Sequence, residues 1–98
     1  MEQPVVINIK NEKYDIYIGR PSLLGNPYGI SKSMSRECVI EKFEKYAYQK
    51  IKVDTKFRET VKNLKGRLGC YCKPLACHGD VLVKLWRELN NVQENKTV

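Results

Sequence analysis

The sequence predicts a small single-domain α/β protein with elements in the order β-β-α-α-β-α and a short mixed sheet on which helices pack. Three observations predict this fold: two β-rich runs near the N-terminus, helical apolar periodicity in the middle and at the end, and a short apolar run between the helical regions. Of the 98 residues, 42% are hydrophobic and 30% are charged, which is typical of one globular domain. Within residues 1–98 we expect an ordered core over about 4–90 and a frayed tail over 91–98.

The two N-terminal strands are predicted at residues 5–9 (VVINI) and 14–18 (YDIYI). The polar residues 11–13 between them have the length of a hairpin connection, so we expect the two strands to pair antiparallel. An irregular stretch rich in glycine and proline follows, from Gly19 to Ser31. Loops of this length in compact domains are usually functional.

Three helices follow from capping residues and apolar periodicity. Ser33 or Ser35 can cap the first helix, Asp54 can cap a shorter one that ends at Gly66, and the last begins near Cys77 and His78. The apolar positions that we expect to be buried are Val39, Ile40, Phe43, Tyr46, Ala47 and Ile51 in the first helix, Phe57, Val61 and Leu64 in the second, and Val81, Leu82, Leu85, Trp86 and Leu89 in the third.

A short apolar run over residues 67–72 precedes Pro74 and is predicted to be a buried strand. A strand, a helical crossover and another strand usually form a parallel unit, so the strands at 14–18 and 67–72 are expected to be parallel neighbours. The segments that follow these strands then emerge at one edge of the sheet. Ligands of open α/β sheets bind at this edge.

The loop after the second predicted strand supplies the first set of candidate binding residues. Gly19 and Gly25 permit close approach of the backbone, and Arg20 offers a planar fork of donors for phosphate or carboxylate. Asn26 is held extended by the following proline, and Tyr28 can stack on a base or bind a ribose hydroxyl. The alternative is a surface loop that its Gly and Pro residues merely shape, with Arg20 paired to a local acid.

The segment after the last predicted strand contains three cysteines and the one histidine of the chain. A zinc ion held by Cys70, Cys72, Cys77 and His78 is one hypothesis, because thiolate and imidazole are the ligands that zinc prefers. The C-x-C-x4-C-H spacing departs from paired C-x2-C motifs, and adjacent Cys77 and His78 are poorly placed to bind the same ion. We therefore favour no cofactor, with zinc as the alternative.

A reactive thiol is a second hypothesis for the same segment. Cys77 at a helix N-terminus would have a lowered pKa, with His78 or Lys73 assisting and Asp80 completing a catalytic set. Cys70 and Cys72 can instead be small apolar residues on one face of a strand. No third member that would orient the base is identifiable, so we favour no catalytic residues.

Anion binding at the start of the last helix is the reading that we favour. Exposed amides there bind anions without any catalytic group, and Gly79 lets a ligand approach the first turn. His78 and Lys73 can donate to phosphate or ribose oxygens, and Asp80 can cap the helix or accept from a sugar.

The charge balance of the chain is basic, with 18 Lys and Arg against 11 Asp and Glu, a net charge of +7. Such a surface favours anions, either a phosphorylated small molecule or a nucleic acid backbone. In the region 36–67, however, acidic and basic residues alternate, which is also typical of a solvated helical face. Four cysteines without a disulfide pattern indicate a reducing compartment, so we expect the cytoplasm of a bacterium or an infected host cell. The sequence contains neither an apolar run of membrane-spanning length nor a signal sequence, so we expect no membrane association.

Two motifs carry a resemblance to a known family. The first is YIGR at residues 17–20 with GNPY at 25–28, and the second runs from Leu68 to Leu82 and contains CYCKPLACHGDVL. At these motifs the chain resembles a family of small phage and bacterial proteins known only as a domain of unknown function. The resemblance implies a compact α/β fold and a phage or bacterial origin, and it implies no activity.

We therefore expect a binding protein for a nucleotide-derived anionic ligand, which a phage could use to sequester a host immune nucleotide signal. One alternative is a small enzyme that hydrolyses a nucleotide or an ADP-ribose-type substrate with His78, Asp80 and Cys77. Another is a zinc-stabilised module that binds nucleic acid or protein through the basic helices. We also expect a homo-oligomer, because a chain of this size offers little concavity and pockets often form between subunits.

Overall fold

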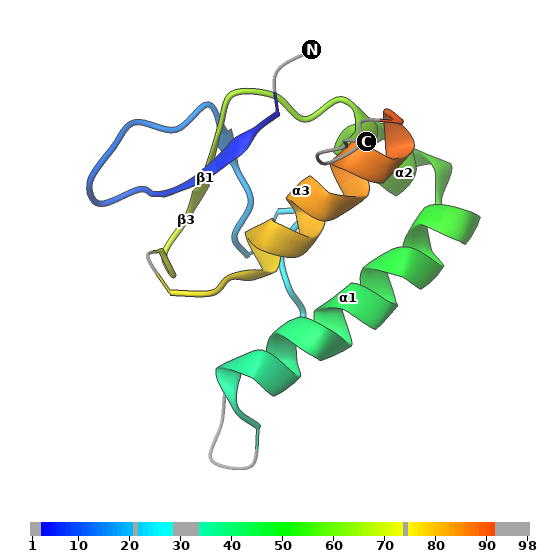
Figure 1. Ribbon diagram of the computed structural model, residues 1–98, viewed down its shortest axis with the longest axis horizontal. Helices are drawn as coiled ribbons and strands as arrows, with labels where there is room; N and C mark the ends of the chain where they lie inside the picture. Colours follow the sequence, from blue (N-terminus) through cyan, green and yellow to red (C-terminus); the bar gives the residue numbers. More distant parts are fainter. Residues whose placement is uncertain (1–2, 21, 29–33, 74, 92–98) are drawn as a thin grey trace, which may run out of the picture.

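The computed structural model describes residues 3–20, 22–28, 34–73 and 75–91. Within these ranges the elements follow the predicted order β-β-α-α-β-α, which confirms the α/β class (Figure 1). They are β1 (Val5–Asn8), β2 (Ile16–Tyr17), α1 (Arg36–Val53), α2 (Thr55–Lys62), β3 (Arg67–Cys70) and α3 (His78–Leu89). The fraying predicted for residues 91–98 concerns residues that, apart from Asn91, lie outside these ranges.

β3 is the central strand of the sheet, whose order is β1-β3-β2. Leu68 of β3 lies between Val6 of β1 and Ile16 of β2, and both pairings are parallel. The predicted parallel neighbourhood of the segments 14–18 and 67–72 is confirmed. The predicted antiparallel hairpin of the first two strands is wrong, and these three strands form a parallel sheet instead of a mixed one. The physical reason is burial: Leu68, Gly69 and Cys70 are all buried, so β3 takes the position in which both edges are paired.

The connection between β1 and β2 returns along one face of β3. Ile9 donates its N–H to Cys70 at the end of β3 (3.0 Å), whereas Asp15 donates to Arg67 at its beginning (2.8 Å). The chain therefore travels back past the full strand before β2 begins. It passes over Gly69, where an added Cβ would come within 2.5 Å of the Ile9 side chain and 2.8 Å of Tyr14. Glycine at position 69 is thus required by close approach of this connection.

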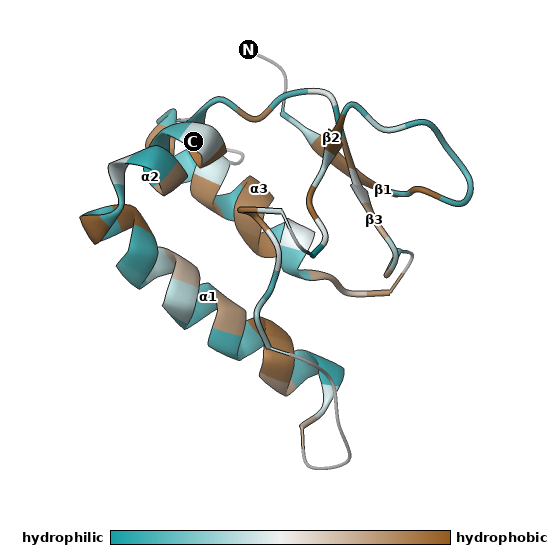
Figure 2. Ribbon diagram, turned by 180° about the vertical axis from the view of Figure 1, so that it is seen from behind, coloured by the Kyte–Doolittle hydropathy of each residue, from teal (hydrophilic) through white to brown (hydrophobic). Residues whose placement is uncertain are grey.

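The opposite face of the sheet is covered by α3, and α1 and α2 pack on the far side of α3 (Figure 1). Gly79 in the first turn of α3 lies against the sheet, since a Cβ there would come within 2.8 Å of Ile18 and 3.0 Å of Val6. Figure 2 shows hydrophobic residues on α3 where this helix lies between the sheet and α1. Trp86 and Leu82 of α3 and Phe43 of α1 are fully buried in this core.

Two of the three helices begin at capping residues that the sequence identified, and the third begins at the predicted place beside Cys77. The Ser35 hydroxyl accepts from the Cys38 N–H (3.2 Å), and the Asp54 carboxylate accepts from the Phe57 N–H (3.0 Å). Cys77 caps α3 through its sulfur. α2 ends at Lys62, before the predicted Gly66, which instead adopts a positive φ of 76° directly before β3. These boundaries place the starts of α1 and α3 near the carboxyl ends of the parallel strands.

We expect Gly69→Ala to destabilise the fold by about 1–3 kcal/mol, because the new methyl group must displace Ile9 or Tyr14 from the connection above it. Urea unfolding followed by tryptophan fluorescence measures this change. The matched control is Val5→Ala, an exposed position in the neighbouring strand, for which we expect a change within about 0.5 kcal/mol. Equal effects of the two substitutions would contradict the crossing described above.

Candidate functional site

A cleft of about 500 Å³ opens at the carboxyl ends of β2 and β3, beside the starts of α1 and α3. It lies at the edge of the sheet where the sequence placed a ligand site. The structure thus brings the glycine-rich loop after β2 and the cysteine- and histidine-containing segment after β3 together at one cavity. The described residues that line it are Tyr17, Gly19, Arg20, Asn26, Tyr28, Arg36, Val39, Ile40, Cys70, Tyr71, Cys72, Ala76, Cys77 and His78.

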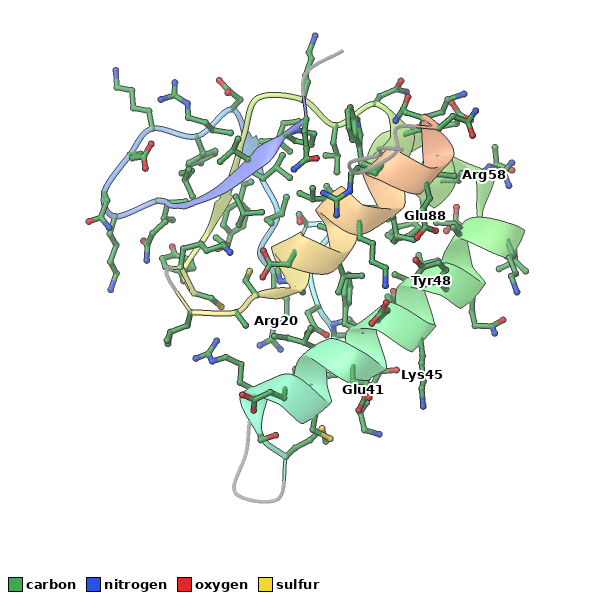
Figure 3. The ribbon with its side chains drawn as sticks, viewed as in Figure 1. Arg20, Glu41, Lys45, Tyr48, Arg58 and Glu88 are labelled. Carbon is green, nitrogen blue, oxygen red and sulfur yellow. The ribbon has the colours of Figure 1, made fainter. Side chains whose placement is uncertain are left out.

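Arg20 enters the cleft directly after β2. The last ladder bond of this strand is donated by Ile18 to Gly69 (3.0 Å), and the Tyr17 hydroxyl then donates to the Arg20 carbonyl (2.9 Å). A Cβ at Gly19 would collide with the Tyr17 ring, so glycine permits this turn. Figure 3 shows Arg20 between the start of α3 and α1, and the residue is exposed. Its guanidinium is therefore available to a ligand.

Tyr28 forms the wall of the cleft next to α1. The Asn26 side chain accepts from the Tyr28 N–H (2.8 Å) and fixes the turn that presents the ring. The Tyr28 ring meets Tyr46 edge to face, with 6.1 Å between centroids, and the Lys42 ammonium lies 5.8 Å from its centre. Gly25 supports this loop without lining the cleft, because it packs against the backbone of Gly19 and Arg20.

Arg36 is a site residue that the sequence analysis counted only among the basic residues of a helix. It is the first residue of α1, and its guanidinium donates to the Ala76 carbonyl (3.2 Å), which spans the cleft from α1 to the segment before α3. Val39 and Ile40 of the same helix add apolar surface. The available signal was the position of Arg36 directly after the Ser35 cap, since a helix start attracts anions.

Tyr17 and Tyr71 form the wall next to the sheet, and the sequence analysis missed both as site residues. Tyr71 follows the last residue of β3, and its ring meets Tyr17 edge to face with 6.4 Å between centroids. Tyr71 is 59% exposed, so most of its surface is open to solvent or to a ligand. Its place directly after a parallel strand was the signal that could have identified it.

His78 lines the cleft, but its ring is already used in hydrogen bonding and packing within the fold. Its Nε2–H donates to the Ile18 carbonyl at the end of β2 (2.8 Å), and its ring packs edge to face on Phe43 with 5.1 Å between centroids. The carbonyl fixes the neutral tautomer, so Nδ1 is an acceptor and faces the Cys77 sulfur at 3.6 Å. Burial lowers the pKa of His78. A neutral imidazole whose N–H is already used is a poor phosphate donor.

Cys77 is a buried capping residue. Its sulfur accepts from the Gly79 N–H (3.3 Å), while Asp80 accepts from the Cys77 N–H (3.1 Å), which together form a capping box. Burial raises the pKa of the Cys77 thiol, and contact with the Cys70 thiol raises it further. The reactive-thiol hypothesis required a lowered pKa at this helix start, and the raised pKa argues against it because desolvation outweighs the helix dipole.

Besides Gly25, three of the predicted binding residues do not line the cleft. Lys73 and Asp80 form an ion pair (2.8 Å) that lines a separate groove beside Pro4 and Val6, and the hydrogen bond to Asp80 raises the pKa of Lys73. Gly79 is buried against the sheet. Because Asp80 also accepts from the cap, its carboxylate stabilises the start of α3.

The zinc hypothesis finds no support in the described part of the chain. No group of three or more His, Cys, Asp and Glu side chains there is arranged to hold one metal ion. Cys70, Cys72 and Cys77 are free thiols that line the cleft, and the His78 Nε2 is bound to a backbone carbonyl. The arrangement fits packing and capping better than metal ligation.

The electrostatic character of the cleft is positive. Its charged lining consists of Arg20 and Arg36, and no Asp or Glu is among the described residues that line it. The starts of α1 and α3 add the positive ends of two helix dipoles. The cleft therefore combines cationic, aromatic and apolar surface and favours an anion with a planar group.

Comparison with known proteins identifies the family of this chain. The model of a domain of unknown function, DUF4326, matches residues 7–88. The chain belongs to this family. The predicted membership of a domain-of-unknown-function family with phage members is thereby confirmed.

Two viral relatives of the DUF4326 family resemble this chain over most of its length. An uncharacterised 12.4 kDa protein of the nrdA-td intergenic region of Enterobacteria phage T4 is 36% identical over 85 residues, 86% of this chain and 78% of its own length. Uncharacterised protein R718 of Acanthamoeba polyphaga mimivirus is 30% identical over 112 aligned positions, 89% of this chain and 82% of its own length. No solved structure matches. Among the described residues, no helix has the length and apolarity that crossing a membrane requires.

His78 generates a prediction about pH, because it is the one histidine of the chain. Its folded-state pKa is lowered, so the unfolded chain binds the proton more readily. The stability that neutral His78 contributes is complete above the unfolded pKa of about 6.5 and is lost as the pH falls toward the folded pKa.

We expect His78→Gln to cost about 1–3 kcal/mol at pH 7.5, through the weakened bond to Ile18. The difference in unfolding free energy between the wild type and this variant should then narrow below about pH 6.5, by at most about 1.4 kcal/mol per pH unit. Urea unfolding at several pH values measures it. A difference that stays constant from pH 7.5 to 5 would contradict a buried neutral imidazole.

Proposed function

We propose that the cleft binds a nucleotide-derived anionic small molecule. The observation that carries this proposal is the composition of the cleft: two guanidinium groups and three tyrosine rings, with no carboxylate among the described lining residues. Arginine suits phosphate because its planar fork donates two parallel hydrogen bonds. Tyrosine suits a base or a ribose because it offers a flat ring and a hydroxyl.

The phosphate position lies between Arg20 and Arg36. Arg20 reaches the cleft from the loop after β2, and Arg36 reaches it from the start of α1. The bond from Arg36 to Ala76 uses one of its five donors, so the others are available to an anion. Both guanidinium groups are held near a helix start, where the dipole strengthens attraction to phosphate.

Binding without chemistry is the form of this function that we favour. The groups that a hydrolase would need are occupied: Cys77 caps α3, Asp80 holds that cap and Lys73, and His78 donates to Ile18. A thiol with a raised pKa is a weak nucleophile at neutral pH. Since related proteins occur in a phage and a giant virus, sequestration of a host nucleotide signal is the use that we propose for such binding.

Nucleic acid binding through the basic helices is the weaker candidate. Some of the helical cations are already paired, as Lys84 with Glu44 (2.7 Å) and Lys50 with Asp54 (3.6 Å). Binding of this kind would fall steeply with salt and would be insensitive to changes in the cleft. A homo-oligomer stays a prediction, and the cleft lies within one chain, so the binding proposal does not depend on it.

We expect Arg20→Ala and Arg36→Ala each to weaken binding of ADP about tenfold or more, because each removes a charged hydrogen-bond donor from the phosphate. Isothermal titration calorimetry measures the affinity. Lys45→Ala is the matched control: it removes the same charge from α1, and Figure 3 shows Lys45 pointing away from α3. Equal losses in all three variants would show a general effect of net charge and would contradict a defined phosphate site.

Recovery of the nucleotide after incubation distinguishes enzymatic conversion from binding without reaction. We expect nucleotides incubated with the protein to be chromatographically unchanged after heat denaturation, because the groups of the proposed catalytic set, Cys77, His78 and Asp80, are already hydrogen-bonded within the fold. Altered nucleotide would instead support the hydrolase. Its loss in a Cys77→Ala variant that still binds ligand would then identify the reactive group.

A further inference from the structure

The cleft has two separate aromatic surfaces. Tyr28 belongs to the α1 side, where its ring is supported by Tyr46. Tyr17 and Tyr71 belong to the sheet side, where Tyr14 supports Tyr17 with 6.0 Å between centroids. Both supporting rings, Tyr46 and Tyr14, lie outside the lining of the cleft. Each surface is thus held in place by its own element, independently of the other.

The two surfaces do not touch each other within the described residues, where the ring contacts of Tyr28 are with Tyr46 and those of Tyr71 are with Tyr17. Both surfaces line the same cleft, whose volume is about 500 Å³. A mononucleotide has one base and can stack on one of these surfaces. The second surface would then be exposed without a partner.

Each aromatic surface also has its own guanidinium. Arg20 comes three residues after Tyr17 on the sheet side, and Arg36 begins the helix against which Tyr28 packs. The cleft therefore repeats one arrangement, a ring with an arginine, on two sides. This repetition matches a molecule that itself repeats a base and a phosphate.

We propose that the ligand is a dinucleotide, with one base on Tyr28, the other on Tyr71, and the linking phosphates between Arg20 and Arg36. This inference rests on the proposed function and narrows its ligand class. Stacking on aromatic side chains tolerates different bases, because every base has a flat face. The proposal therefore specifies the two-base architecture and leaves the identity of each base to hydrogen bonding.

The test compares ligands with the same number of phosphates. Calorimetry is run with ADP and with diadenosine diphosphate, in which two adenosines share two phosphates, and with the guanine counterparts of both. We expect at least one two-base compound to bind about tenfold or more tightly than its one-base partner, although the one-base compound has the greater negative charge. Charge alone predicts the opposite order.

Two variants test the two surfaces separately. Tyr28→Ala and Tyr71→Ala should each weaken the two-base compound about tenfold, whereas only one of them should weaken the one-base compound. Tyr71 is 59% exposed, so its truncation leaves the fold intact even if that of Tyr28 does not. The control is Tyr48→Ala on α1: the Tyr48 hydroxyl donates to Glu88 (2.6 Å) outside the cleft, and we expect both affinities to be unchanged (Figure 3).

The outcomes distinguish this inference from the function on which it rests. If the one-base compounds bind and the two-base compounds bind no more tightly, the dinucleotide inference is wrong and nucleotide binding stands. If neither class binds, the proposed function fails together with it. Equal loss in the Tyr71→Ala and Tyr48→Ala variants would also overturn the assignment of Tyr71 to a base.

Discussion

The buried hydrogen bond from His78 to the Ile18 carbonyl joins the two segments on which the site depends. Ile18 directly follows β2 and precedes Gly19 and Arg20, while His78 begins α3 and follows the cysteine-containing segment. The bond is 2.8 Å long and buried. Leaving a buried donor or acceptor without a hydrogen bond costs free energy of folding. The start of α3 therefore cannot move relative to the end of β2 without breaking it. This connection fixes the distance between the two sides of the cleft.

The parallel sheet places both segments at one edge. In a parallel sheet every strand ends on the same side, so β2 and β3 deliver Arg20 and Tyr71 to the same rim. This arrangement requires β3 at the centre and a connection that returns over it from β1 to β2. The absence of a side chain at Gly69 permits that return. Gly69 does not line the cleft, but the geometry of the cleft depends on it.

The sequence predicted what local chemistry determines. The caps at Ser35 and Asp54 could be identified because a side-chain acceptor at a helix start has a recognisable spacing from the apolar residues that follow. For α3 the sequence suggested Asp80 as a cap, and Asp80 does accept from the Cys77 N–H, but the cap formed by the Cys77 sulfur was not predicted. The cleft residues Arg20, Asn26 and Tyr28 could be proposed because a loop after a parallel strand is a binding position. The caps needed only neighbouring residues, whereas the position of the loop rested on the expected parallel pairing of segments 14–18 and 67–72.

The parallel pairing of segments 14–18 and 67–72 was predicted, but other features that depend on competition between distant segments were not. The polar residues 11–13 fit a hairpin locally, but β3 pairs with both N-terminal strands and separates them. Arg36 and Tyr71 reach the cleft only through the packing of α1 against α3 and the register of β3. Lys73 and Asp80 were misplaced because their spacing is equally compatible with a ligand site and with the ion-paired cap that they form.

The polar groups of the cleft fall into a buried, hydrogen-bonded set and an exposed set, and this arrangement favours ligand recognition over catalysis. The groups at the bottom of the cleft, Cys77 and His78, are buried and already hydrogen-bonded, so they make this part of the structure rigid. The hydrogen bond from the Gly79 N–H favours a thiolate, yet burial raises the pKa of Cys77, which means that desolvation dominates there. The groups on the rim, Arg20 and Tyr71, are exposed and free to meet a ligand. If the cleft binds the proposed anionic ligand, the cost in ordering is low, because the structure has already fixed the backbone that presents the cationic and aromatic side chains of the rim.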